Sequence, residues 1–329
     1  MRANNKTMQW LLTGGLLVVA LVLPHVVYPL FLMKMLCFML FAAAFNLLLG
    51  YTGLLSFGHA AFLGGAGYIT GLVMTRMQMD PLLGILTGTA FAAALGLVMG
   101  MVAIRRQGIY FSMITLALAQ MFYFYCLQAK FTGGEDGLQG IPRGTLLGAL
   151  PLQNDMTMYY FVLALVVAAF ALIYRTIHSP YGQVMKAIKD NEPRTISLGY
   201  QTQHFKLIAF VLSATLAGLA GATKSVVLGF ATLTDVYWAT SGLVILMTLI
   251  GGMSTFWGPM LGAAIVVMLE NRLGNIGRAL ASATGVPWFH KLGEEVNLVI
   301  GFIFVLCVML FRKGIVGEWL AWRDKRRAS

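Results

Sequence analysis

The sequence has very few charged residues for its length. Of 329 residues only 11% are Asp, Glu, Lys or Arg, whereas 59% are hydrophobic. About a quarter of the residues of a typical soluble domain are charged, so this chain cannot cover a water-facing surface with polar groups. A soluble enzyme, a DNA-binding protein and a disordered chain are therefore excluded.

Cysteine and catalytic motifs are scarce as well. Cys37, Cys126 and Cys307 lie far apart in apolar runs, which is typical of small core residues and excludes a disulfide or metal framework. We find no H-E-x-x-H, no G-x-S-x-G and no cysteine–histidine constellation. We therefore expect no catalytic residue, no metal and no cofactor.

Long apolar runs are what the chain has instead. A membrane span needs about 20 mostly apolar residues, and the runs are continuous where an outer-membrane barrel would alternate. We predict an all-α polytopic membrane bundle, residues 1–329 forming a single transmembrane domain. Its ten predicted spans are 9–28, 31–50, 53–73, 82–104, 108–128, 157–177, 204–230, 237–253, 258–272 and 294–312.

The basic residues predict the orientation of this bundle. Ten spans place both termini on one side, which we take as the cytoplasm. The far side would hold six basic residues (Arg76, Lys130, Arg143, Arg272, Arg278 and Lys291), and Lys34 and Lys224 lie within spans. The remaining fifteen of the 23 would be cytoplasmic, as the positive-inside rule requires. The N-terminal run is too long for a cleaved signal peptide.

Ionisable groups within the predicted spans are few. None of the twelve carboxylates is predicted near the bilayer centre, where a proton-coupled transporter normally keeps one. Lys34 and Lys224 lie close enough to span ends for their stems to snorkel to the interface. We interpret His59 as a hydrogen-bonded packing residue. Energy for transport is therefore expected from a partner, although sodium coupling through backbone carbonyls stays open.

One segment resembles a nucleotide-binding loop. Gly218 to Ser225 reads GLAGATKS, close to G-x-x-x-x-G-K-[ST], but Thr223 replaces the second glycine. The segment lies in an apolar run with no preceding strand. We interpret its small residues as a helix–helix contact face, and we do not expect this chain to hydrolyse ATP itself.

Seven glycines interrupt the stretch from Gly50 to Gly71. Either the helix is broken and exposes its backbone along a transport path, or the glycines let neighbouring helices approach closely. The residues alone do not decide between these two interpretations. The candidate path residues of this stretch are Gly53, Ser56, Phe57, Gly58, His59 and Gly64.

A second glycine-rich stretch covers residues 242–262. Gly251-Gly252 and Gly258-Pro259 bracket a short polar and aromatic turn, which predicts a tight hairpin between two shortened spans or one re-entrant feature. Its sequence STFWGPMLGA weakly resembles SFGHAAFLGG from residues 56–65, as internal repeats of transporters would. The candidate path residues here are Gly251, Gly252, Ser254, Gly258 and Pro259.

A polar loop, 178–203, follows the sixth predicted span. Ser179 and Pro180 favour a helix start, and Pro193 favours its stop. The helix would have an apolar and a polar face, carrying Val184, Met185, Ala187 and Ile188 against Gln183, Lys186 and Lys189. This pattern is typical of a short amphipathic surface helix. It either lies on lipid headgroups or docks its apolar face into a groove of a cytosolic partner.

Six motifs in a fixed order are specific as a set. They are NLLLGYTGLLSFGHAAFLGGAGY (46–68), GIYFSMITLALAQ (108–120), TGGEDGLQGIP (132–142), SPYGQVMKAIKDNE (179–192), SLGY (197–200) and LIGGMSTFWGPMLGA (249–263). Together they resemble the M-type permease subunit of ATP-binding-cassette (ABC) transporters for branched-chain amino acid uptake. The resemblance covers roughly residues 36–314.

This resemblance implies a type II-like ABC importer permease for branched-chain or other apolar amino acids in the bacterial inner membrane. Its implied partners are a second homologous permease, two cytosolic ABC ATPases, a periplasmic amino-acid-binding protein and membrane lipid, without nucleic acid. The implied coupling helix to the ATPase comprises Tyr181, Gly182, Val184, Met185, Lys186, Ile188 and Lys189. The basic tail, 312–329, would be cytoplasmic.

The predicted periplasmic loop, 129–156, is long enough to touch the binding protein. Its candidate contact residues are Gly133, Gly134, Glu135, Asp136 and Gly137. A plain hydrated connector is the alternative interpretation of this loop.

Other functions stay open at this point. Related ABC permeases carry urea or aromatic acids. A secondary transporter or channel belongs to a different class, and its uptake would survive loss of the ATPases. A membrane-embedded enzyme would need a cluster of polar catalytic residues at an interface, and the sequence shows none.

Overall fold

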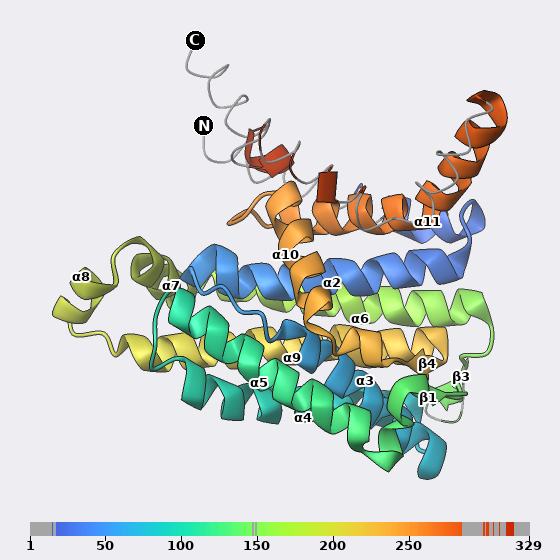
Figure 1. Cartoon of the computed structure of the whole chain (residues 1–329), viewed down its shortest axis with the longest axis horizontal. Coiled ribbons are helices and arrows are strands. Elements are labelled where there is room, and N and C mark those ends of the chain that lie inside the picture. The colour runs from blue at the N-terminus through green and yellow to red at the C-terminus, as the bar shows by residue number, and fades with distance from the viewer. Residues whose placement is uncertain are drawn as a thin grey trace.

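The computed structural model describes residues 15, 18–146, 148, 150–284, 299, 301–302, 305, 309 and 314–318, with side chains in the last long helix described as far as Arg272. This part of the chain is a bundle of helices running side by side (Figure 1). The long helices are α2 (Pro29–Thr52), α3 (His59–Arg76), α4 (Pro81–Ala103), α5 (Ile109–Gln128), α6 (Asp155–His178), α9 (Thr202–Leu228), α10 (Trp238–Gly251) and α11 (Gly258–Thr284).

Five helices, α2, α4, α5, α6 and α9, are long and apolar enough to cross a membrane. At 1.5 Å per residue a helix of about 20 residues matches the hydrocarbon thickness of a bilayer. Their ends agree with the predicted spans to within two residues. Helix α10 is apolar but has only 14 residues. Eight of the twenty residues of the predicted span 9–28, and fourteen of the nineteen of 294–312, lie outside the described residues.

Helix α3 begins six residues later than the predicted span 53–73. Gly53 ends α2 in the left-handed conformation, with φ 75°, and the chain then runs without helix to Gly58. The predicted span 258–272 is too short, because α11 continues to Thr284. Glu270, predicted at a span end, therefore lies in the interior of that helix.

Short elements gather at the two ends of the bundle (Figure 1). At one end, called the α7 end here, lie α7 (Pro180–Asp190) and α8 (Glu192–Ser197). At the opposite end, called the strand end, β1 (Leu138–Gln139) pairs antiparallel with β4 (Phe230–Ala231), and β2 (Thr145–Leu146) pairs with β3 (Leu150–Pro151). The 3-10 turns there are η2 (Lys130–Thr132), η3 (Gly134–Asp136) and η4 (Leu233–Asp235), while η1 (Leu23–His25) precedes α2.

Helix α9 lies at the centre and packs against α2, α3 and α4. Its small residues make this possible. A Cβ added at Gly218 would overlap Ala92 of α4, and one at Gly221 would overlap the carbonyl of Leu63 in α3. The predicted helix–helix contact face is therefore confirmed, and the stretch that resembles a nucleotide-binding loop is helical throughout.

The outward faces of α4 and α5 are apolar. Val98 of α4 and Met113 and Met121 of α5 are among the large apolar side chains exposed there. An exposed apolar surface of this extent is what lipid-facing helices present. The helices thus define a multi-pass membrane protein.

Candidate functional site

Helix α7 begins as its sequence predicts. The Ser179 hydroxyl accepts a hydrogen bond from the Gly182 N–H, and Pro180 occupies the first turn. The stop differs from the prediction. Helix α7 ends at Asp190, Asn191 caps α8 through the Arg194 N–H, and Pro193 lies in the first turn of that next helix. The proline therefore starts α8, which the sequence analysis did not predict.

The apolar face of α7 is covered by this chain itself. Gly182, Met185 and Ile188 are buried, and α7 packs against α2, α6 and α9. This corrects the expectation that the apolar face docks on a partner. The exposed surface of the loop is formed instead by other side chains, among them Gln183, Ala187, Ile196, Leu198 and Tyr200.

Tyr181 fixes the start of α7 to α9. Its ring stacks on Phe205 at 5.6 Å between centroids, and its hydroxyl donates to the Phe205 carbonyl at 2.8 Å. Burial raises the pKa of Tyr181, which keeps the phenol neutral and able to donate. On the other side of the helix, the Lys186 ammonium lies 5.6 Å from the centre of the Tyr51 ring, and Val184 is half-buried.

Lys189 joins α7 to two other segments. Its Nζ donates to the Gly50 carbonyl at 2.7 Å, in the last turn of α2, and to the Ser254 hydroxyl at 2.6 Å, in the turn between α10 and α11. Burial lowers the pKa of Lys189, an effect that the neighbouring Asp190 opposes. A single side chain thus links the surface helix to both predicted path segments.

Asn46 strengthens the same junction and was not singled out from the sequence. Its side-chain amide donates to the Thr255 carbonyl at 3.0 Å and accepts from the Ser254 N–H at 3.2 Å. The Ser254 hydroxyl also donates to the Gly50 carbonyl at 2.7 Å. The signal that could have found Asn46 is a lone amide within a 24-residue apolar helix, because such a group needs polar partners.

The non-helical segment 53–58 is held by side chains of α5. The Ser112 hydroxyl donates to the Leu55 carbonyl at 2.6 Å, and the Phe57 N–H donates to the Thr115 hydroxyl at 3.2 Å. Within the segment, the Ser56 hydroxyl accepts from the Gly58 N–H at 3.1 Å. The chain is therefore non-helical between α2 and α3, and neighbouring hydroxyls satisfy part of the freed backbone, as apolar surroundings require.

His59 opens α3 and is completely buried. Its Nε2 lies 2.8 Å from the Ser213 hydroxyl, which in turn lies 2.6 Å from the Ala44 carbonyl. Because the hydroxyl gives its one proton to that carbonyl, Nε2 is the donor. The rings of Phe45 and Phe62 meet the imidazole edge to face. The interpretation of His59 as a hydrogen-bonded packing residue is thus confirmed.

Several candidate path glycines serve close packing. An added Cβ at Gly64 would overlap Val236, and one at Gly251 would overlap the Gly258 carbonyl. Gly251 and Gly252, the latter at φ 116°, form a tight turn between α10 and α11. Pro259 occupies the first turn of α11 and is buried. The interruption and the close packing therefore occur together.

The N-termini of α3 and α10 also meet inside the bundle. The Ala60 N–H in the first turn of α3 donates to the buried Ser241 hydroxyl in the first turn of α10 at 2.9 Å. Helix N-termini carry partial positive charge. Two of them therefore face a common interior region.

At the strand end, the candidate binding-protein contacts lie in η3 and the residues beside it. Glu135 and Asp136 are exposed. Gly133 and Gly137 have φ values of 80° and 69°, and an added Cβ at Gly137 would overlap the Ala231 carbonyl; Gly134 starts η3. The loop is thus folded back on the chain. Contact with a binding protein and a plain hydrated connector both stay open as interpretations of it.

Both lysines within the predicted spans have carboxylate partners. Lys34 pairs with Glu270, and Lys224 with Asp235. Snorkelling of their stems to the interface stays a prediction. At the α7 end, Lys206 of α9 lies 2.5 Å from Glu192. Among the described residues no group of three or more His, Cys, Asp or Glu side chains could hold a metal ion.

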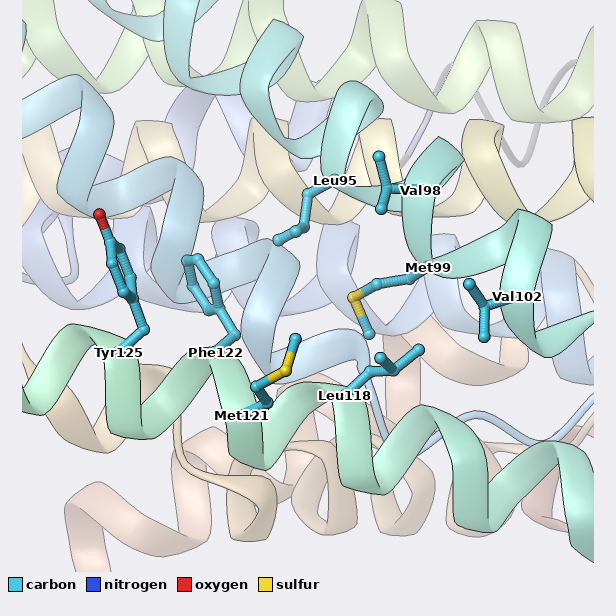
Figure 2. A pocket seen from close by; sticks show the side chains of 8 residues that line it. All are labelled: Leu95, Val98, Met99, Val102, Leu118, Met121, Phe122 and Tyr125. Carbon is cyan, nitrogen blue, oxygen red and sulfur yellow. The ribbon is translucent and has the colours of Figure 1, made fainter.

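Two cavities differ sharply in chemistry. At the α7 end a cavity of about 410 Å³ is lined by residues 52–54, 107–108 and 188–193 together with Lys206. Figure 2 shows the other, about 320 Å³, whose lining from α4 and α5 is apolar apart from the Tyr125 hydroxyl: Leu95, Val98, Met99, Val102, Leu118, Met121, Phe122 and Tyr125. The second cavity has no charged side chain in its lining.

These features define a helical membrane protein. Its surface helix α7 is hydrogen-bonded to the end of α2 and to the turn between α10 and α11. Residues 29–309 match the sequence profile of the family described as branched-chain amino acid transport system / permease component. The chain belongs to this family.

Three relatives illustrate the similarity. The high-affinity branched-chain amino acid transport system permease proteins LivM of Escherichia coli (strain K12) and Salmonella typhimurium (strain LT2) are each 27% identical over 251 residues, covering 68% of this chain and 58% of theirs. The probable branched-chain amino acid transport permease protein LivM of Methanocaldococcus jannaschii is 22% identical over 270 residues, covering 78% and 76%. The chain thus spans little more than half the length of the first two relatives. No solved structure matches it.

Proposed function

We propose that this chain is the membrane-spanning subunit of an ATP-driven importer of branched-chain or other apolar amino acids. The α7 end faces the cytoplasm, where two ABC ATPases bind the α7–α8 loop. A second homologous permease completes the membrane part, and a periplasmic binding protein delivers substrate to the strand end. Family membership and the names of the relatives support this proposal.

The contacts of Lys189 are the observation that supports the proposed coupling mechanism. Its ammonium holds the end of α2 and the turn between α10 and α11 at once. Because α7 is packed on its own bundle as a short rigid helix, a push from a closing ATPase displaces it as a body. Both glycine-rich segments then move with α7. The transport path closes on one side of the membrane and opens on the other.

The proposed substrate is a zwitterion with an apolar side chain. The helix N-termini that meet at Ala60 and Ser241 favour its carboxylate. Backbone carbonyls of the non-helical segment 53–58 favour its ammonium group. Apolar helix faces accept the side chain. None of these groups needs to react, so the chain works as a transport subunit, with ATP hydrolysis left to the partners.

The test is reconstitution in lipid vesicles. The chain is assembled with the second permease, the ATPases and the binding protein, and uptake of labelled leucine is followed with and without ATP. We expect accumulation that requires ATP and every subunit. Leucine accumulation by vesicles that hold this chain alone, or by the complex without nucleotide, would contradict the proposal. Labelled urea and phenylalanine, each supplied with its own binding protein, separate this substrate class from the related ones.

A further inference from the structure

Two ion pairs lie in the half of the bundle nearer the strand end, and the lysine of each lies beside the ring of Phe38. The ammonium groups of Lys34 and Lys224 lie 5.8 and 5.4 Å from the ring centre. Each ammonium has one carboxylate partner, Glu270 of α11 for Lys34 and Asp235 of η4 for Lys224. Ionisable groups at this depth are costly in a membrane and mark functional sites.

The two ion pairs differ in strength and exposure. Lys34 and Glu270 are 3.5 Å apart, and their side chains are 35% and 25% exposed. Lys224 and Asp235 are in closer contact and are only 10% and 16% exposed. The first pair is therefore the one that opens readily, whereas the second is held in place.

A third polar group lies unsatisfied beside the inner pair. The Tyr68 hydroxyl of α3 is buried and has no hydrogen-bond partner among the described residues. It is close enough to the Asp235 carboxylate for the two to interact electrostatically. Buried hydroxyls in folded proteins nearly always have a partner, so this one is available to a ligand.

We propose that Lys34, Lys224, Asp235 and Glu270 form a recognition site for the zwitterionic head of an α-amino acid, with Phe38 as its apolar floor. This inference rests on the proposed function and assigns it a further substrate site, distinct from the helix N-termini at Ala60 and Ser241. When the outer pair opens, the substrate carboxylate pairs with Lys34 and its ammonium group with Glu270. The Tyr68 hydroxyl and the Lys224–Asp235 pair complete the polar lining.

The charge balance of the cluster explains its selectivity. Two positive and two negative groups cancel, so a zwitterion can replace both halves of the opened pair and leave no charge unpaired. A ligand with only a carboxylate or only an amine would leave Glu270 or Lys34 without a partner in a partly buried place, which is unfavourable. The site therefore rejects such ligands because binding them leaves one charge of the site unpaired.

The test uses the reconstituted full complex and two leucine analogues, each lacking one charged group. 4-Methylpentanoate has no amine, and 3-methylbutylamine has no carboxylate. In the unchanged complex we expect neither to inhibit leucine uptake. Glu270→Gln leaves a net positive site, so the carboxylate analogue should now inhibit. Lys34→Met leaves a net negative site, so the amine analogue should inhibit instead.

Two further variants keep the test decisive. Both single variants should slow leucine uptake about tenfold, as loss of one partner of a buried pair implies. The exchange variant Lys34→Glu/Glu270→Lys restores the balance and should again reject both analogues. Arg76→Gln removes an exposed cation at the end of α3 and serves as the control. Membrane insertion and the ATPase rate are measured for every variant.

The outcomes separate this inference from the proposed function. Opposite analogue sensitivity of the two single variants supports the site, because a merely structural ion pair would not produce it. Slower uptake without any change in analogue sensitivity overturns the site while leaving the importer intact, and so does unchanged uptake in all variants. Failure of the unchanged complex to take up leucine with ATP contradicts the proposed function itself.

Discussion

Single polar side chains in apolar helices hold the candidate site together. Asn46 and Ser213 each supply hydrogen bonds that join two or three helices. The sequence predicted the packing role of His59 correctly. It could not predict which partner each polar group has, because those partners are far apart in the chain, as for Asn46 with Ser254 and Lys34 with Glu270.

Lys189→Met tests the junction at α7. Methionine keeps much of the length but loses two charge-assisted hydrogen bonds, each contributing roughly 1.5–3 kcal/mol. We expect leucine uptake by the reconstituted complex to fall about tenfold while ATP hydrolysis continues. The matched control is Arg175→Met, which removes an exposed cation of α6. Equal loss of uptake and ATPase activity, or loss of neither, would show that Lys189 does not couple the two.

Ser213→Ala tests the hydrogen-bond chain through His59. The substitution leaves the buried Nε2 donor without its partner and removes the bond from the hydroxyl to the Ala44 carbonyl of α2. The free energy of unfolding should drop by about 1–3 kcal/mol, seen as a lower thermal midpoint in detergent. Ser197→Ala, on the exposed surface of α8, should change it by less than about 0.5 kcal/mol. Equal midpoints for the two variants would refute the structural role of this chain of contacts.

At the scale of elements, apolar runs predicted the long helices well, since lipid-facing segments need length and hydrophobicity above all. The apolar runs predicted the ends of α3 less well. The segment from Gly53 to Gly58 is as apolar as the helices beside it, yet it is non-helical and hydrogen-bonded to hydroxyls of α5. Helix α8 was missed because Pro193 was interpreted only as a stop, although proline also suits a first turn.

Glycine substitutions distinguish packing from flexibility in the helices. Gly221→Ala places a methyl group against the Leu63 carbonyl of α3, so we expect a loss of about 1–3 kcal/mol from overpacking. Gly242→Ala in α10 meets open space and should be neutral or stabilise by up to about 1 kcal/mol. Thermal unfolding in detergent measures both. If Gly221→Ala proves as stable as Gly242→Ala, α9 does not need its close approach to α3.

At the scale of the whole molecule, the alternation of helix ends agrees with the predicted order of loops. The turn after α2, the α7–α8 loop and the turn after α10 meet at one end through Lys189. The loop after α5 and the segment after α9 meet at the other end through β1 and β4. Alternating apolar and polar segments sufficed to predict this arrangement, because each span must return the chain to the opposite side. The side that faces the cytoplasm remains a prediction from the basic residues.

Labelling of introduced cysteines tests that orientation. Gln183→Cys in α7 and Glu135→Cys in η3 place thiols on exposed surfaces at opposite ends. In intact cells a membrane-impermeant maleimide should label the residue-135 variant only. After the membrane is opened, both should react. Labelling of the residue-183 variant from outside would reverse the topology.

The pairing of β1 with β4 has a mechanical consequence. It fastens the 129–156 loop to the residues directly after α9, and the Ile141 N–H adds a hydrogen bond to the Gly229 carbonyl at 2.9 Å. In the proposed importer, a binding protein docked on Glu135 and Asp136 would therefore act on the central helix α9 through this short strand pair.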